Sequence, residues 1–62
     1  MPMSGKELVG LFKRMGWELV RINGSHHILA KGVVTITVPV HGNKALGKGL
    51  ERKLLKQAGI KK

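Results

Sequence analysis

The chain has 62 residues, no cysteine and a formal net charge of +9 at pH 7, from 12 lysines and arginines against three acidic residues. This length allows one small domain, residues 1–62, and the lack of cysteine excludes disulfide frameworks and cysteine-based metal sites. All three acidic residues are glutamates, which disfavours paired-carboxylate catalysts and two-metal nucleases, because both depend on clustered carboxylates.

A first helix is predicted over Ser4–Gly16. Four apolar residues follow the i, i+3, i+4, i+7 spacing of one helix face: Leu8, Leu11, Phe12 and Met15. Ser4 is a good N-cap residue, and Glu7 three positions later completes the pattern of a capping box. Gly16 can adopt the left-handed conformation that commonly ends a helix.

Three strands are predicted next, at Trp17–Ile22, His26–Lys31 and Val33–Val38. The third is the clearest, because β-branched residues fill it throughout. Two glycine-containing pairs, Asn23-Gly24 and Lys31-Gly32, mark the turns between the strands. Connections this short join antiparallel neighbours, so we expect a three-stranded antiparallel meander.

A loop is expected over residues 40–48, followed by a second helix over Gly49–Ala58 with Gly59 as its stop signal. The apolar stripe of this helix comprises Leu50, Leu54 and Ala58. The order α-β-β-β-α predicts an α+β domain. Both helices are expected to bury their stripes on one face of the sheet, which leaves the other face open to solvent.

The pairing of the second and third strands decides which histidine faces the helices. With Lys31-Gly32 as a two-residue loop, Ala30 pairs with Val33, and paired residues point to the same side of the sheet. One face then holds His27, Leu29, Val34, Ile36 and Val38, and the other holds His26, Ile28, Ala30, Val33, Thr35 and Thr37. The first face is more apolar and should meet the helices, so His26 is expected on the open face. A three-residue loop would reverse this assignment.

The strong positive charge indicates a polyanionic partner. Apolar residues make up 42% of the chain, so it can form a core and is not a disordered basic tail. A folded basic domain suits nucleic acid, an anionic membrane surface or an acidic protein. No apolar run approaches the roughly 20 residues of a membrane span, and Met1–Lys6 lacks a signal-peptide pattern, so a cytoplasmic protein without a membrane segment is expected.

His26 is the candidate catalytic residue. Histidine exchanges protons near neutral pH, and RNA supplies its own nucleophile, the 2′-hydroxyl, so cleavage by this route requires neither a metal nor a cofactor. The alternative interpretation is a strand histidine that only satisfies a hydrogen bond. His27, on the core side, is expected to be structural. A metal site of His26, His27 and His41 is disfavoured, because adjacent strand residues point to opposite faces.

Several residues are candidates for RNA binding. The turn at Gly24-Ser25 can place backbone N–H groups against a phosphate, or it can be a plain hairpin turn. His41, in the loop, can contact phosphate or protonate a leaving oxygen, or be an ordinary loop residue. Lys44, Lys48 and Arg52 cluster around the start of the second helix, where anions bind well, although each can equally be a solvated surface charge.

Five segments carry a family resemblance: Gly16-Trp17, Arg21, Gly24-Ser25-His26-His27, Val38-Pro39-Val40-His41 and Gly49–Gly59. With these motifs in this order, the chain closely resembles the HicA family of mRNA interferase toxins over nearly its whole length. The resemblance implies a double-stranded-RNA-binding-like α-β-β-β-α fold. It also implies a toxin that cleaves mRNA and arrests translation within a type II toxin–antitoxin system, and an antitoxin of the HicB type that covers the active site.

The resemblance also implies roles for single residues. In that family the histidine directly after Gly-Ser is catalytic, which corresponds to His26, and the glycine before it, Gly24 here, is also needed for activity. The chain departs from the family at the start of the second helix, where Gly49-Leu50-Glu51-Arg52 replaces the frequent Gly-Thr-Leu-Arg. No threonine is therefore present for a cap or a phosphate contact at this point.

The leading hypothesis is a metal-independent ribonuclease toxin with His26 as its acid/base. Positive charge for the RNA is assigned to Arg21, Lys44 and Lys48. The competing hypothesis is a non-catalytic double-stranded RNA-binding module, although Glu51 near the start of the second helix disfavours the phosphate contact that such modules make there. A third is an adaptor for acidic proteins. A cognate inhibitor is expected to be acidic and to bury His26, since charge complementarity speeds association.

Overall fold

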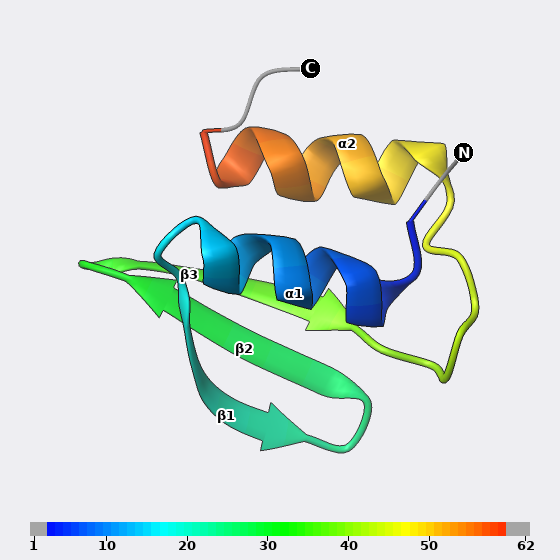
Figure 1. Ribbon diagram of the computed structural model, residues 1–62, viewed down its shortest axis with the longest axis horizontal. Coiled ribbons are helices and arrows are strands. Elements are labelled where there is room, and N and C mark those ends of the chain that lie inside the picture. Colours follow the sequence, from blue (N-terminus) through cyan, green and yellow to red (C-terminus); the bar gives the residue numbers. More distant parts are fainter. Residues whose placement is uncertain (1–2, 60–62) are drawn as a thin grey trace.

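The computed structural model describes residues 3–59 and has the element order α-β-β-β-α (Figure 1). Its elements are α1 (Gly5–Arg14), β1 (Glu18–Asn23), β2 (His26–Lys31), β3 (Val34–Pro39) and α2 (Lys48–Gln57). The strands form one antiparallel sheet in the order β1-β2-β3. The predicted α+β class and meander are confirmed; β2 has its predicted bounds, and the ends of the other elements lie one or two residues from their predicted positions.

The N-terminus of α1 carries the predicted capping box. The Ser4 hydroxyl accepts a hydrogen bond from the Glu7 backbone N–H at 3.2 Å, and the Glu7 carboxylate accepts one from the Ser4 N–H at 3.0 Å. These bonds satisfy backbone donors that the first turn of a helix leaves unpaired. At the other end Gly16 has a φ of 96°, which confirms the predicted left-handed stop.

Both hairpin turns lie one residue later than predicted. Their central residues are Gly24-Ser25 and Gly32-Val33, rather than Asn23-Gly24 and Lys31-Gly32. In each turn a glycine is the first central residue, with a φ of 62° at the first turn and 63° at the second. A positive φ at that position is what a type II′ hairpin turn requires, and glycine adopts it without a steric cost.

The later second turn moves the register between β2 and β3 by two residues. Ala30 pairs with Thr35 instead of Val33, and Val33 lies in the turn with its side chain exposed. A shift of two residues keeps the other side chains on their predicted faces, because strand side chains alternate with a period of two. The fully buried strand residues on the helix side are accordingly Leu29, Ile36 and Val38.

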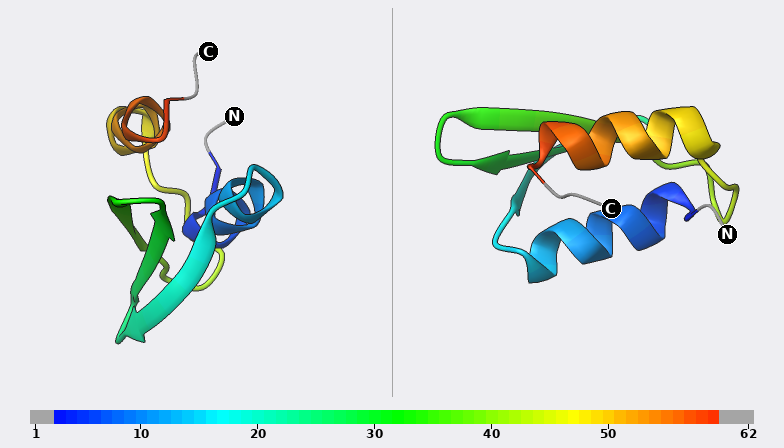
Figure 2. Two further views of the ribbon diagram at one scale, coloured as in Figure 1. Left: turned by 90° about the vertical axis from the view of Figure 1, so that its left-hand side faces the viewer. Right: turned by 90° about the horizontal axis from the view of Figure 1, so that it is seen from above.

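Both helices cover the same face of the sheet and run side by side in the same direction (Figure 1; Figure 2). Within residues 3–59, α1 lies against all three strands, whereas α2 lies against β3. One core results, formed by Leu8, Val9, Phe12, Trp17, Leu29, Ile36, Val38, Leu54 and Leu55. Neither helix in this part of the chain is long and apolar enough to span a membrane.

The loop between β3 and α2 is held against the start of α1. The Leu46 N–H donates to the Met3 carbonyl at 3.0 Å. The Val40 N–H donates to the Ser25 carbonyl at 2.7 Å, which joins the end of β3 to the first hairpin turn. One end of the domain therefore gathers the first turn, this loop and the starts of both helices (Figure 1).

Candidate functional site

His26 lies on the open face of the sheet, as strand parity predicts. It is the first residue of β2 and pairs with Asn23 on one side and Pro39 on the other. Its side chain is exposed, and no hydrogen bond or ion pair to it is found within residues 3–59. This imidazole is therefore accessible to a substrate that approaches from the side the helices leave open.

Arg21 shares this face with His26 because β1 contains a β-bulge. The register shifts by one residue between Leu19 and Arg21, so Val20 is an extra residue in β1 and Arg21 lies opposite Ile28. Without the extra residue Arg21 would point to the helix side, since side chains alternate along a strand. The bulge instead places Arg21 in the cross-strand row next to that of His26.

Gly24 and Ser25, predicted to bind phosphate, form the turn directly before His26. Gly24 has a φ of 62°, and no atom lies within 4 Å of the position that a Cβ would occupy, so the space beside this residue is open. Ser25 is half-buried, and its carbonyl accepts the Val40 N–H. The turn beside His26 is therefore held in place by this hydrogen bond, and the space next to the Gly24 backbone is open.

His41 and Lys44 lie together in the loop after β3. The Lys44 N–H donates to the His41 carbonyl at 3.1 Å, and both residues line a cavity of about 240 Å³ that Pro39 also lines. Because Pro39 is the cross-strand partner of His26, this loop begins beside the open-face histidine. Lys48 is exposed as the first residue of α2, at the same end of the domain.

Glu51 is directed into the fold at the start of α2. Its side chain is only 6% exposed, and its carboxylate accepts a hydrogen bond from the Met3 N–H at 2.6 Å. The carboxylate that was expected to disfavour phosphate binding is therefore hydrogen-bonded inside the fold. Lys48 is the exposed charged residue of the first turn of α2.

Within the described residues, no acidic side chain lies in the cross-strand rows of His26 and Arg21. Glu7 belongs to the capping box of α1, and Glu51 is buried. Glu18 shares the open face, but it pairs with Ala30 at the end of β1 far from the first turn, one row beyond that of Arg21. These are the three acidic residues of the chain. The end of the domain that carries His26 therefore presents positive charge, which suits a polyanion.

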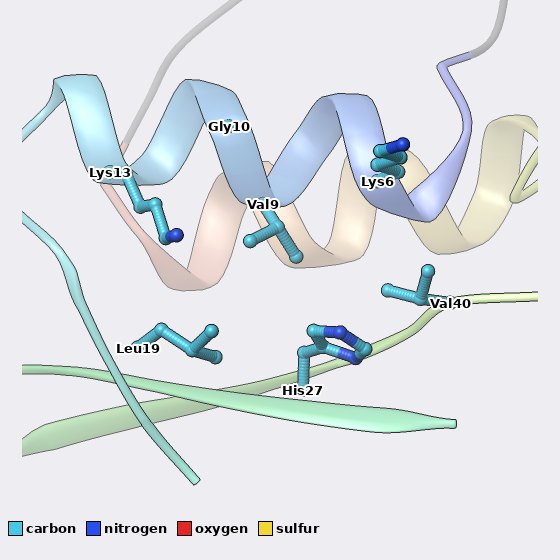
Figure 3. A pocket seen from close by; sticks show the side chains of 7 residues that line it. All are labelled: Lys6, Val9, Gly10, Lys13, Leu19, His27 and Val40. Carbon is cyan, nitrogen blue, oxygen red and sulfur yellow. The ribbon is translucent and has the colours of Figure 1, made fainter. Parts of the chain in front are cut away.

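His27 points away from His26, towards α1. It is half-buried, and its Nδ1 lies 3.4 Å from the Ser25 carbonyl oxygen. Its ring lines a cavity of about 320 Å³ between α1 and the sheet (Figure 3). The other residues that line this cavity are Lys6, Val9, Gly10, Lys13, Leu19 and Val40.

The predicted position of His27 on the core side is confirmed, whereas the cavity and its two lysines were not predicted from the sequence. A signal for them was present in α1. Lys6, Gly10 and Lys13 recur at i, i+4 and i+7, which puts them on one side of the helix. A glycine in a helix interior is also unfavourable unless something requires it.

The histidines do not converge. His26 and His27 lie on opposite faces of the sheet, as their adjacency in a strand predicts. Within residues 3–59, no three histidine or carboxylate side chains are grouped so that they could hold a metal ion. The open face therefore offers single groups for chemistry, the His26 imidazole and the Arg21 guanidinium.

The chain matches a family model. The model, described as the HicA toxin of bacterial toxin-antitoxin, matches residues 5–60. No match is found among curated proteins. The matched range contains both helices, the whole sheet and every candidate site residue from Arg21 to Arg52.

Proposed function

Because the chain belongs to the HicA toxin family of bacterial toxin–antitoxin systems, we propose that it is an endoribonuclease toxin that cleaves mRNA and so arrests translation. It acts in the cytoplasm as the toxin of a type II system. The family supports the role as a toxin, and the net charge of +9 supports a nucleic acid as its target.

His26 is the general base of the proposed reaction. It removes the proton from a ribose 2′-hydroxyl, the 2′-oxygen attacks the adjacent phosphorus, and the bond from phosphorus to the 5′-oxygen of the next nucleotide breaks. The products are a 2′,3′-cyclic phosphate and a 5′-hydroxyl that takes up a proton. The nucleophile belongs to the RNA, so the proposal includes no metal ion or cofactor.

Arg21 stabilises the negative charge that develops on the phosphate. A cation beside the reacting group stabilises the negative charge that develops in the transition state. The presence of His26 and Arg21 on one open face, beside the uncovered Gly24-Ser25 turn, is the observation that carries the proposal.

The remaining predicted residues bind the RNA. Gly24 and Ser25 offer backbone N–H groups to a phosphate beside His26, and Lys44 and Lys48 extend the positive surface along the same end of the domain. His41, in the loop that begins beside the His26 row, donates the proton that the leaving 5′-oxygen takes up.

An acidic antitoxin of the HicB type is the proposed protein partner. The end of the open face that carries Arg21 and His26 has no acidic side chain in their two cross-strand rows, and Glu18 lies one row further along, so an acidic surface complements that end. By covering this face the antitoxin would exclude RNA from His26. A neutral or basic partner that leaves His26 accessible in the complex would contradict this assignment.

The first test expresses the wild type and His26→Ala from a tightly repressed promoter and follows growth and mRNA integrity. We expect the wild type to stop growth and degrade mRNA and the variant to do neither. Thr37→Ala is the matched control, because Thr37 is exposed on the same face of β3. Circular dichroism of the purified proteins establishes that all three are folded. A folded His26→Ala variant as toxic as the wild type would refute the catalytic role.

A second test uses purified protein and a short RNA with one 2′-deoxy position. Cleavage at that position should stop, because the nucleophile is missing, and cleavage elsewhere should yield cyclic phosphate ends. Addition of EDTA should leave the rate unchanged. Cleavage at the deoxy position, or a loss of activity with EDTA that added metal restores, would contradict the mechanism.

The alternative function, a non-catalytic double-stranded RNA-binding module, is favoured by one observation. Glu51 is held inside the fold, so Lys48 meets no exposed carboxylate in the first turn of α2. Such a module would bind duplex RNA tightly and leave single-stranded mRNA intact. Two results together would favour the binding module. Expression of the wild type would neither slow growth nor degrade mRNA, and the purified protein would bind duplex RNA saturably.

A further inference from the structure

We propose that the cavity around His27 binds one nucleotide of a single-stranded RNA, on the face of the sheet opposite to His26. The inference names where the substrate of the proposed ribonuclease is held, so it rests on the proposed function. Its evidence is separate, however, because neither His26 nor Arg21 lines this cavity.

The size and walls of the cavity fit a nucleobase. Its volume of about 320 Å³ lies at the lower end of the range for small-ligand sites, which starts at about 300 Å³. Val9 from α1, Leu19 from β1 and Val40 after β3 form apolar sides, and His27 lies between them (Figure 3). An apolar pocket with a few convergent polar groups is the usual form of a site for a small organic group.

Two lysines at the cavity are placed to contact the phosphates on either side of a bound nucleobase. Lys6 and Lys13 lie seven residues apart in α1, which is about 10 Å along the helix axis. They approach the cavity from its two ends (Figure 3). No acidic residue lines it. In an RNA strand each base is flanked by two phosphates, and one lysine at each end can contact one of them.

The glycine at position 10 indicates a ligand, because the packing of the fold does not explain it. It lies in the interior of α1, where glycine is less favourable than alanine. A Cβ at this position would meet no atom within 4 Å, so neighbouring side chains do not require a glycine. The missing side chain does leave room at the cavity, so a base can approach the backbone of α1.

His27 adds a directional group. If its Nδ1–H donates to the Ser25 carbonyl, 3.4 Å away, the Nε2 of the neutral ring is left as an acceptor. Such an acceptor pairs with the exocyclic amino group of adenine, cytosine or guanine. Ile22, the cross-strand partner of His27, is 57% exposed although it lies on the helix side. Hence the β1 side of this row is left uncovered, whereas Val38 on its β3 side is buried.

The test is a titration of ¹⁵N-labelled protein, followed by amide chemical shifts. The probes are the four nucleoside 3′-monophosphates, the parent nucleosides, inorganic phosphate and a short single-stranded RNA with 2′-O-methyl riboses, which cannot be cleaved. We expect the RNA to shift the amides of Val9, Gly10, His27 and Val40. It should bind more tightly than any mononucleotide, because only the strand offers a phosphate to both lysines.

Two sets of variants distinguish RNA binding in this cavity from nonspecific attraction of RNA to a basic protein. Lys6→Gln with Lys13→Gln should weaken RNA binding about tenfold or more, because charge-assisted contacts are lost. The charge-matched control, Lys53→Gln with Lys56→Gln, removes two exposed lysines of α2 and should change affinity less than about twofold. Gly10→Leu should fill the cavity and abolish the pocket shifts, whereas Gly10→Ala should remain folded and bind.

Three results would overturn the proposal. The first is a set of RNA shifts confined to the open face, at Arg21 and His26. The second is an equal loss of affinity in the control pair, which would mean that charge alone binds RNA. The third is a pocket that responds to an acidic peptide such as oligoglutamate but to no RNA, which would assign it to an acidic protein.

The His26→Ala variant separates this inference from the proposed function. It should still bind the 2′-O-methyl RNA in the His27 cavity while cleaving nothing. If wild-type protein fills the cavity with RNA but leaves cleavable RNA intact, the proposed catalysis fails and the nucleotide site stands. If RNA is cleaved but Gly10→Leu neither loses binding nor slows cleavage, the site fails and the catalysis stands.

Discussion

Arg21 occupies the same face of the sheet as His26 because the strand that carries it contains one extra residue. The bulge at Val20 changes the partner of Arg21 to Ile28, whose side chain shares the open face. Bulges next to functional sites commonly redirect a side chain in this way. A local irregularity in β1 thus places a guanidinium near the imidazole.

Arg21→Gln should lower the rate of RNA cleavage without unfolding the protein. The loss of one cation aimed at the developing charge commonly costs about 100-fold in rate, while an exposed strand residue contributes little to stability. The measurement is kcat/KM on a short RNA, with thermal unfolding as the folding check. Arg14→Gln, exposed at the end of α1, is the charge-matched control and should stay close to the wild-type rate. Equal losses in both variants would mean that Arg21 has no specific role.

Gly5→Ala should destabilise the fold, whereas the same change at Gly10 should not. A Cβ on Gly5 would overlap the backbone carbonyl of Pro39, so α1 and the end of β3 would have to separate. We expect a loss of about 1–3 kcal/mol in the free energy of unfolding. Gly10→Ala adds a methyl group to open space and should gain about 0.5–1 kcal/mol from helix propensity. Urea unfolding of both variants measures the difference, and equal stabilities would contradict this close packing.

Local rules were enough to predict most of the fold. The capping box at Ser4 and the left-handed stop at Gly16 depend on nearby residues, and both are present. The side chains of β2 and β3 point to their predicted faces although the predicted register was wrong. The error is two residues, which is one full period of the side-chain alternation. The position of the first turn was wrong because Asn-Gly and Gly-Ser are both good turn pairs, and the sequence does not show which one the register selects. In the second turn Gly32 can be either central residue, and its positive φ fits the first of them.

The site was less predictable because its parts depend on long-range contacts. Plain alternation from Leu19 would have put Arg21 on the helix side. The residue type at the bulge, Val20, does not indicate a bulge in the sequence. Glu51 is held by Met3, which is 48 residues away in the sequence. The cavity beside His27 exists only once α1 has docked on the sheet. The position of His26 was predictable because parity and a neighbouring turn determine it.

Glu51→Ala should loosen the N-terminal segment as well as lower stability. The substitution removes the acceptor of the Met3 N–H in a partly buried setting, where an unpaired donor costs at most the roughly 1–3 kcal/mol of a fully buried one. Because Met3 also accepts from Leu46, hydrogen exchange at the Leu46 amide should become faster. Glu51→Gln keeps an acceptor and should lose less stability. Unchanged exchange at Leu46 in Glu51→Ala would contradict the coupling of these segments.

The capping box should make stability depend on pH through Glu7. The hydrogen bond from the Ser4 backbone N–H, and then that with the Ser4 side chain, lowers the pKa of the Glu7 carboxyl from its ordinary value of 4.5. A carboxyl whose pKa is lower in the folded state stabilises the fold above the unfolded value and loses this contribution as the pH falls through the folded value.

Urea unfolding of the wild type and Glu7→Gln at a series of pH values tests this effect. The free energy of unfolding of the wild type should exceed that of the variant at neutral pH. The difference should begin to shrink near pH 4.5 and vanish once the carboxyl is protonated in both states. Glu18→Gln, an exposed glutamate at the start of β1, is the control for a general effect of charge. A difference between wild type and Glu7→Gln that stays constant from neutral to acid pH would mean that the ionised carboxylate does not stabilise the start of α1.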